Sequence, residues 1–419
     1  MAAMEKDTRV ACGEKLQIES LPLSSGDNML TERDFSLVLG GPLFQLLRRA
    51  HLSDDAPALV RKRIIIISMF AWLPLLIFSA MEGNALGGHA AVPFLMDVEI
   101  YTRFLVALPL LIIAELVVHQ RMRPLVKQFL ERDLISESDM PRFNAAIASA
   151  FRLRNSVLAE LLLIALVYIV GIMIIWRQYM VLNAATWYAA PSAGGSTLSL
   201  AGIWFAYISL PVFQFLLIRW YFRLFIWMRF LWQVSRIELR LVPTHPDRVG
   251  GLGFLSDTVF AFVPLALAHG ALLAGVLANR IFFTGAKFSN FKMETAALVI
   301  FLLCVVIGPL LVFATQLAQV KRKGMREYGI LAQRYVREFD DKWLRGGAPA
   351  GEALMGSGDI QSLADLNNSL EIVKSMKAAP VTKDSIILLA VATLAPVAPL
   401  FLTIMPLEEL LKKLLSILF

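Results

Sequence analysis

Two acidic residues lie inside apolar stretches, where a charge needs a physical explanation. Glu115 stands in "FLVALPLLIIAELVVH" and Glu160 in "VLAELLLIALVYIVGIMIIW". A charge at the centre of a membrane helix costs roughly 2.5–3.5 kcal/mol on insertion scales. Glu115 precedes Arg121 by six residues and Glu160 follows Arg154 by six, so both carboxylates are expected at similar depth and can meet. Two interpretations stay open: an interhelical or snorkelling ion pair, and a site that handles a solute or a proton.

Arginines in "RWYFRLFIWMRFLWQVSRIELR" (219–240) are the obvious partners of these carboxylates. Helical spacing at about 100° per residue places five of them within an arc of about 140°: Arg219, Arg223, Arg229, Arg236 and Arg240. Aromatic residues alternate with them. The stripe is either an anion-attracting vestibule or pore lining, or an interfacial helix whose arginines contact lipid phosphates.

The stretch "THPDRVGGLGFL" (244–255) is the densest polar cluster next to an apolar run. It carries His245, Asp247 and Arg248, followed by three glycines. Glycines permit positive φ and expose backbone N–H groups beside the start of the next helix, which suits an anion or an acidic side chain. The alternative is a tight turn in which Asp247 caps or pairs locally and nothing binds.

The sequence does not contain the complete motifs that several known activities require. The His-Pro-Asp tripeptide also marks J-domains, but there it joins two soluble helices, and here an apolar run follows. Ser256 occupies the third glycine position of a dinucleotide fingerprint. His245 and Asp247 are too few ligands for a metal, and the sequence has no Walker A, HExxH or serine-elbow motif. We therefore predict no catalytic residue, metal or cofactor, and leave enzyme activity uncertain but disfavoured.

His269 stands in the middle of the apolar run "LALAHGALLAG". A histidine there is either an interhelical hydrogen-bonding group or a ligand. The pairs Ala266/Gly270 and Ala271/Gly275 predict close helix packing around it. Arg103 and Arg280 fall near the outer ends of their apolar runs and are expected to snorkel.

The composition identifies the class of protein that must position these residues. Of 419 residues, 57% are hydrophobic and only 17% are charged, against roughly 45–50% and 25% in soluble domains. The formal charge of +7 is best explained by basic loops on one membrane face, not by nucleic-acid binding. The chain is predicted to be an all-α, polytopic membrane protein.

Six apolar runs are expected to span the membrane: 64–80, 95–119, 157–176, the run from about 200 into Arg219, 257–279 and 296–318. Basic residues flank alternate ends of these runs, which predicts a cytoplasmic N-terminus. A seventh run, 385–405, contains Pro396 and Pro399 and either crosses or folds back.

These runs divide the chain into four parts. Residues 1–60 form a cytoplasmic tail with an interfacial amphipathic helix over 40–52, and 61–320 form the six-helix transmembrane domain. Residues 321–383 form a cytoplasmic segment in which helices over 321–344 and 359–376 are expected. Residues 384–419 hold the seventh run and a C-terminal interfacial amphipathic helix.

Two long stretches carry a family resemblance: "LVPTHPDRVGGLGFL" (241–255) and "GSGDIQSLADLNNSLEIVKSM" (356–376). "GGPLFQLLRRAHL" and "PLEELLKKLL" fit it as well, so the resemblance spans most of the chain. The chain resembles a group of bacterial integral membrane proteins with these signatures. The resemblance implies a bacterial inner-membrane location and carries over no catalytic or binding residue.

Three functions are compatible with this pattern. The first is a channel or transporter for an ion or small solute, with a charged site near the cytoplasmic face. The second is a membrane sensor or assembly factor that acts through its cytoplasmic helices. The third is a membrane-embedded enzyme on lipid head groups that uses His245 and Asp247. The expected partners are the lipid bilayer, an ion or small solute, and a second copy of the chain.

Overall fold

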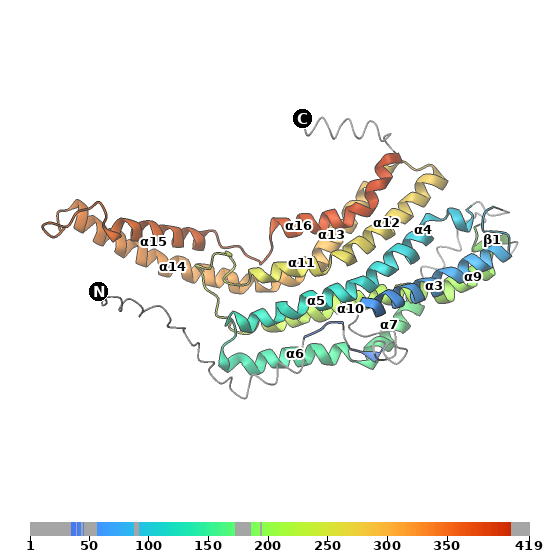
Figure 1. The fold of residues 1–419 in the computed structure, drawn as a ribbon, viewed down its shortest axis with the longest axis horizontal. Coiled ribbons are helices and arrows are strands. Elements are labelled where there is room, and N and C mark those ends of the chain that lie inside the picture. Colours follow the sequence, from blue (N-terminus) through green and yellow to red (C-terminus); the bar gives the residue numbers. More distant parts are fainter. Residues whose placement is uncertain are drawn as a thin grey trace, which may run out of the picture. The chain divides into compact units, whose positions relative to one another are not determined.

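The computed structural model of the protein describes residues 35–38, 40–42, 45, 57–87, 92–171, 186–192 and 195–403. The expected N-terminal tail, most of the expected helix over 40–52 and the expected C-terminal amphipathic helix lie outside these residues. Within them the chain is helical apart from one short hairpin and the turns and loops that connect the elements (Figure 1).

The first two long helices are α3 (Pro57–Met81) and a second that runs from Val98 to Glu131. The second consists of α4 (Val98–Tyr101), a π-helical turn (Thr102–Ala107) and α5 (Leu108–Glu131). Asp97 caps α4 by accepting a hydrogen bond from the Ile100 N–H, which satisfies one of the free donors of the first turn.

Two helices then form a bent pair. α6 (Met140–Arg154) and α7 (Val157–Val170) meet at an angle of 47°. Ser156 starts α7 by accepting a hydrogen bond from the Ala159 N–H, so the break is a new N-terminus and not a kink. The third predicted apolar run thus begins at α7, and residues 172–176 of it lie outside the described part.

A two-stranded antiparallel hairpin precedes the next helix. It pairs β1 (Ala189–Ser192) with β2 (Gly195–Leu198). Just before it, Trp187 donates its indole N–H to Asp97 Oδ2 at 2.8 Å, and Asn279 donates to Asp97 Oδ1 at 2.7 Å. This network fixes the hairpin to the start of α4 and to α12.

After the hairpin, α9 (Leu200–Trp204), a π-helical turn (Phe205–Ser209) and α10 (Leu210–Val234) form one long helix.

The loop that follows leads into a 3-10 turn (Gly253–Asp257), α11 (Thr258–Ala261) and α12 (Val263–Thr284). Next come a 3-10 turn (Phe288–Phe291), α13 (Lys292–Ile307), a 3-10 stretch (Gly308–Phe313) and α14 (Ala314–Phe339), with a terminal π-helical turn (Asp340–Leu344). The helix tightens at Gly308-Pro309, where Pro309 removes a backbone N–H from the helical pattern.

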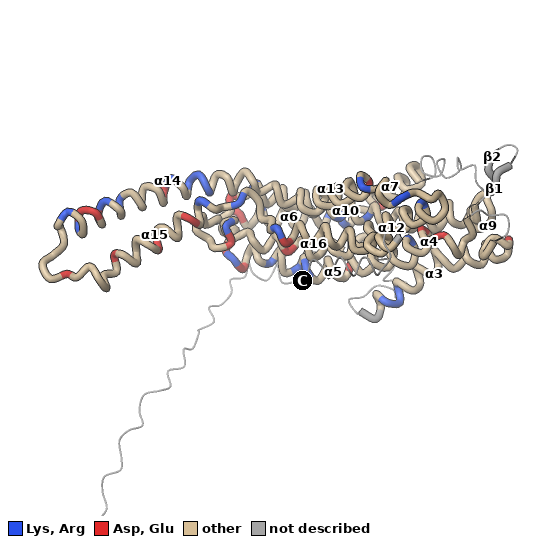
Figure 2. Tube along the Cα trace, turned by 90° about the horizontal axis from the view of Figure 1, so that it is seen from above, with Lys and Arg blue, Asp and Glu red and all other residues tan. Residues whose placement is uncertain are grey.

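The last described helices are α15 (Gly358–Lys374) and α16 (Lys383–Leu394), followed by a 3-10 stretch (Ala395–Thr403). α15 packs along α14, and its Asp359 receives hydrogen bonds from the π-helical turn after α14, from Lys342 at 2.9 Å and from the Trp343 indole at 2.9 Å. Lys, Arg, Asp and Glu are frequent along α14 and α15, whereas α3 carries no charged residue after Arg63 (Figure 2).

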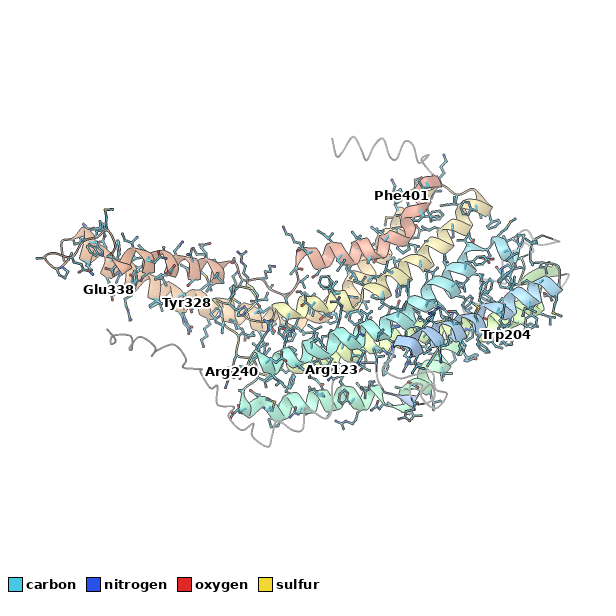
Figure 3. The ribbon with its side chains drawn as sticks, viewed as in Figure 1. Arg123, Trp204, Arg240, Tyr328, Glu338 and Phe401 are labelled. Carbon is cyan, nitrogen blue, oxygen red and sulfur yellow. The ribbon has the colours of Figure 1, made fainter. Side chains whose placement is uncertain are left out.

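Helix α12 lies between α4 and α5 on one side and α16 on the other (Figure 1). A Cβ added at Gly270 would overlap the Thr393 backbone oxygen, and one added at Gly275 would overlap the Thr102 hydroxyl. Phe401, labelled in Figure 3, also packs against Phe288, with ring centroids 4.6 Å apart. The predicted small-residue packing is confirmed.

Among the described residues, six helices are long and apolar enough to cross a membrane, and the bent pair of α6 and α7 makes a seventh. Large apolar side chains on α7 are widely exposed, including Leu158, Leu161 and Leu162. In water such a surface would be costly, and in lipid it is not. The prediction of an all-α membrane protein with six to seven spans is confirmed.

Candidate functional site

The carboxylate of Glu115 lies inside the helix bundle among three arginines. Glu115 belongs to α5 and is 7% exposed. Arg223 of α10 donates to Glu115 Oε1 at 2.7 Å, and Arg219 approaches the same oxygen at 3.4 Å. Arg63 of α3 donates to the other oxygen, Oε2. Three helices are therefore tied together by one buried carboxylate.

Arg219 connects this carboxylate to the second one. Its Nη2 lies 3.5 Å from Glu160 Oε1, while its Nη1 faces Glu115. Glu160 belongs to the first turn of α7 and is also buried. The two acidic residues therefore do meet as the sequence predicts, through a shared arginine and not by direct contact. We call Arg63, Glu115, Glu160, Arg219 and Arg223 the arginine cluster.

Sequence reasoning missed Arg63, because Arg61-Lys62-Arg63 resembles an ordinary basic flank of a span. Within this tripeptide, Arg61 and Lys62 are exposed and Arg63 is buried. Ala71 and Ser79, eight and sixteen residues further along α3, are fully buried. At about 100° per residue they lie about 80° and 160° round the helix from Arg63, so they mark no single face, and the sequence held no clear signal that Arg63 points inward.

The arginine cluster holds more positive than negative charge. Its three guanidinium groups stand against two carboxylates. Each guanidinium offers five N–H donors and each carboxylate about four acceptor sites, so the donors outnumber these acceptors. Arg154 lies at the edge and donates to the Ser36 backbone oxygen at 2.6 Å.

A glycine pair lets the main chain approach this group of charges. Gly40 and Gly41 have φ of 136° and 91°, a region that favours glycine. A Cβ at Gly40 would lie 2.6 Å from the Arg154 guanidinium, and one at Gly41 would lie 3.0 Å from Glu160 Oε1. The "GG" that opens the expected 40–52 helix therefore serves close contact with the cluster.

A cavity of about 360 Å³ adjoins the arginine cluster. Arg63, Glu115 and Arg219 line one part of it. The remaining wall comes from apolar side chains and one tyrosine: Ile67, Phe70, Ile112, Ile164, Val167, Tyr168, Pro211, Val212, Phe215 and Leu216. The cavity is thus charged in one region and apolar elsewhere.

The His-Pro-Asp-Arg loop is a separate feature, and its backbone donors are already used. The Asp247 carboxylate accepts hydrogen bonds from the N–H groups of Val249 (2.9 Å), Gly251 (3.1 Å) and Gly253 (2.8 Å). His245 Nδ1 lies 2.9 Å from Asp247 Oδ1. The geometry agrees with the interpretation of a locally satisfied turn, since Asp247 occupies the place where an external anion was expected.

These contacts also set the acidity of the loop. Partial burial raises the pKa of Asp247, but the N–H groups of Val249, Gly253 and Gly251 and the neighbouring His245 lower it more, so it lies below its usual value.

The loop joins several elements. Arg132 donates to the Gly251 oxygen at 3.3 Å and the Lys377 N–H to the Arg248 oxygen at 2.8 Å. The Arg248 side chain is exposed.

His269 is buried on α12 and bonds two groups. Its Nδ1 lies 2.7 Å from the Leu265 backbone oxygen, so this nitrogen carries the proton. Nε2 is then the acceptor for the Tyr221 hydroxyl of α10 at 2.6 Å. The structure thus supports the interhelical hydrogen-bonding interpretation and does not place His269 in the arginine cluster.

Two sequence predictions about arginines are wrong: the length of the arginine stripe and the position of Arg103. α10 ends at Val234, so Arg236 and Arg240 do not continue its stripe, and Arg240 instead lies 3.3 Å from Asp133 (Figure 3). Arg103 does not snorkel: it is buried, pairs with Glu99 and lies over the Phe205 ring at 5.9 Å. Arg280 is exposed as expected.

In the described part of the chain, no group of three or more His, Cys, Asp or Glu side chains is placed to hold a metal ion. Comparison of the chain with protein-family models, with curated proteins and with solved structures finds no match in any of the three. The assignment of function therefore depends on the geometry of the arginine cluster and its cavity.

Proposed function

We propose that the protein is a membrane transport protein, a channel or a transporter, for an anion that binds at the arginine cluster. The observation that carries the proposal is the excess of arginines over carboxylates beside a cavity, inside a helix bundle with an apolar exterior. Ionisable groups inside membrane bundles are expensive and mark pathways for ions or solutes.

The charge excess favours a ligand over a purely structural role. Buried ion pairs repay their desolvation only when geometry is good and the remaining donors are satisfied. A structural pair needs one arginine for each carboxylate, whereas here three arginines converge on Glu115. An anion in the cavity adds a further acceptor for these arginines, and guanidinium groups suit phosphate and carboxylate because they bind them bidentately.

Glu115 gives the site a means of release. Its carboxylate contacts all three arginines and competes with an incoming anion for the same N–H groups. Transport needs binding that is favourable enough for entry and weak enough for exit. The cluster therefore fits an exchangeable anion better than a permanently bound one.

The proposed location is a bacterial inner membrane with a cytoplasmic N-terminus. Its support is the alternation of basic and uncharged connections along the chain. In this orientation the arginine cluster lies towards the cytoplasmic ends of α3, α5 and α10. A positive site near that face draws anions from the cytoplasm.

The test is flux in proteoliposomes. We expect the wild-type protein to move anions and not K⁺ or Na⁺, and Arg219→Gln to reduce anion flux by about tenfold or more, as for loss of a charge-assisted contact. Arg61→Gln removes an exposed charge from α3 and serves as the matched control. A folded wild-type protein that moves no anion would refute the proposal.

A second candidate function is docking of a partner protein on α14 and α15. Large apolar side chains stay exposed on α14, among them Ile330, Leu331 and Val336. Deletion of 324–378 should then release a co-purifying protein while anion flux persists. The lipid-head-group enzyme gains no support, because the Asp247 carboxylate is held by backbone donors.

A further inference from the structure

We infer that the cavity beside the arginine cluster binds an anionic amphiphile, a hydrocarbon chain with a phosphate or carboxylate head, which enters sideways from the lipid. The inference rests on the proposed function and narrows its anion to one chemical class. It follows from where the cavity opens, what its walls are made of, and where its charges lie.

Part of the cavity wall is exposed on the outside of the helix bundle. Three of its wall residues have exposed side chains: Phe70 is 50% exposed, Ile164 is 41% exposed and Tyr168 is 42% exposed. They come from α3 and α7, so the opening lies between these two helices. A hydrated inorganic ion would have to leave water and cross hydrocarbon to use this route, whereas an amphiphile already lies there.

The walls suit a hydrocarbon chain. Of the thirteen lining residues in the described part of the chain, ten carry no formal charge and nine of these are apolar, contributed by α3, α5, α7 and α10. A small hydrophilic anion gains nothing from such walls, and stripping its water there is costly. A hydrocarbon chain that enters from the lipid meets walls as apolar as the surroundings it leaves, so it loses no hydration on entry.

The charges are grouped so that a head group can reach them. Arg63 and Arg219 line the cavity and are each 6% exposed, so both are held within the protein. They come from different helices and contact different oxygens of Glu115. A head group between them receives two guanidinium groups at once, the arrangement that phosphate and carboxylate favour.

The cavity is large enough to hold part of such a molecule. At about 360 Å³ it lies at the lower end of small-ligand pockets, which hold roughly 300–1,000 Å³. It accommodates the head and the first part of a chain, and the rest extends into the lipid through the opening between α3 and α7.

The experiment measures binding by native mass spectrometry and thermal unfolding of the full chain in non-ionic detergent. The probes are oleate, phosphatidylglycerol, phosphatidylcholine with the same chains, and inorganic phosphate. We expect oleate or phosphatidylglycerol to bind saturably and raise Tm, and phosphatidylcholine to bind at least about tenfold more weakly. Binding of oleate but not phosphatidylglycerol would identify the ligand as a free single-chain anion. Binding of phosphatidylglycerol but not oleate would identify it as a membrane lipid.

Paired variants test the two parts of the site. Ile164→Trp fills the opening and leaves every arginine in place, while Leu158→Trp adds the same ring on exposed α7 surface outside the cavity. Arg63→Gln removes a head-group contact, and Arg61→Gln is its exposed control. We expect Ile164→Trp and Arg63→Gln to weaken amphiphile binding by about tenfold and both controls to change it by less than about twofold.

The outcomes separate this inference from the proposed function. If anion flux is unchanged in Ile164→Trp and inorganic phosphate competes as well as oleate, the amphiphile is wrong and anion transport stands. If amphiphiles bind as expected but no anion moves in proteoliposomes, the site stands and transport is wrong. If oleate and phosphatidylglycerol bind no better than phosphatidylcholine, the inference is overturned.

Discussion

At the scale of single residues, the molecule depends on the carboxylate of Glu115. It is the common partner of Arg63, Arg219 and Arg223, which come from two other helices. Removing one member of a buried ion group leaves the others uncompensated, which costs more than the net value of the interaction. The cluster is therefore both a candidate binding site and a point at which the bundle is sensitive to substitution.

Replacement Glu115→Gln keeps the shape of the side chain and removes its charge. We expect a loss of stability of about 3–5 kcal/mol, because three buried arginines then repel one another. Thermal unfolding in detergent measures it. Glu131→Gln on the exposed end of α5 is the control and should leave Tm unchanged. A Glu115→Gln protein as stable as wild type would show that the ion pairs are not formed.

The Asp247 turn predicts a dependence of stability on pH. Its pKa lies below the usual value, so its carboxylate stabilises the fold fully above about pH 3.9, the value in unfolded chains, and less as pH falls through the lower folded pKa. Asp247→Asn should therefore cost about 1–3 kcal/mol at pH 7 and progressively less below pH 4. Unfolding curves between pH 7 and pH 3 measure it, with the exposed Asp257→Asn as control. A cost that does not change with pH would exclude the charged carboxylate as its source.

The residues of the candidate site were predictable to different degrees. Glu115, Glu160, Arg219 and Arg223 were identifiable because a charge within an apolar run is costly and needs a partner. Arg63 was not, since it shares a basic tripeptide with two exposed residues, and only helix rotation distinguishes them. The closed form of the Asp247 turn depends on φ at Gly250 and Gly251, which the sequence permits but does not require.

At the scale of elements, close packing of α12 is the feature that the sequence predicted best. Small residues four apart on an apolar helix have few uses other than close approach of another backbone. The end of α10 was predicted poorly, because "SRIELR" continues a helical pattern of arginines and contains no glycine or proline. Tertiary contacts of the following segment, including the Arg240 N–H with the Leu134 oxygen, end the helix instead.

Gly270→Ala tests the contact between α12 and α16. The added Cβ overlaps the Thr393 backbone oxygen, so we expect destabilisation of about 1–3 kcal/mol. Gly329→Ala in α14 is the matched control, since nothing lies within 4 Å of its Cβ position. It should stabilise the helix by about 0.5–1 kcal/mol. Equal effects of the two substitutions, measured by thermal unfolding, would contradict the close contact.

At the scale of the whole molecule, the apolar exterior and the arginine cluster together define a membrane protein with a charged interior. Six to seven spans follow from the length of the apolar helices, whereas orientation rests on the positions of basic residues. Single cysteines at Leu86 and Arg123, introduced into a protein lacking Cys12 and Cys304, should react with an impermeant maleimide from opposite sides of the membrane. Labelling of both from one side would refute the proposed topology.

The proposed function requires that an anion occupy the cavity beside Arg63 and Arg219. A cryo-EM map of the protein in nanodiscs that contain phosphatidylglycerol tests this most directly. The account predicts density for a head group in contact with both guanidinium groups, continued by a chain along Phe70 and Ile164 towards the lipid. A map in which protein side chains close the cavity, with every arginine of the cluster satisfied by protein acceptors alone, would contradict it.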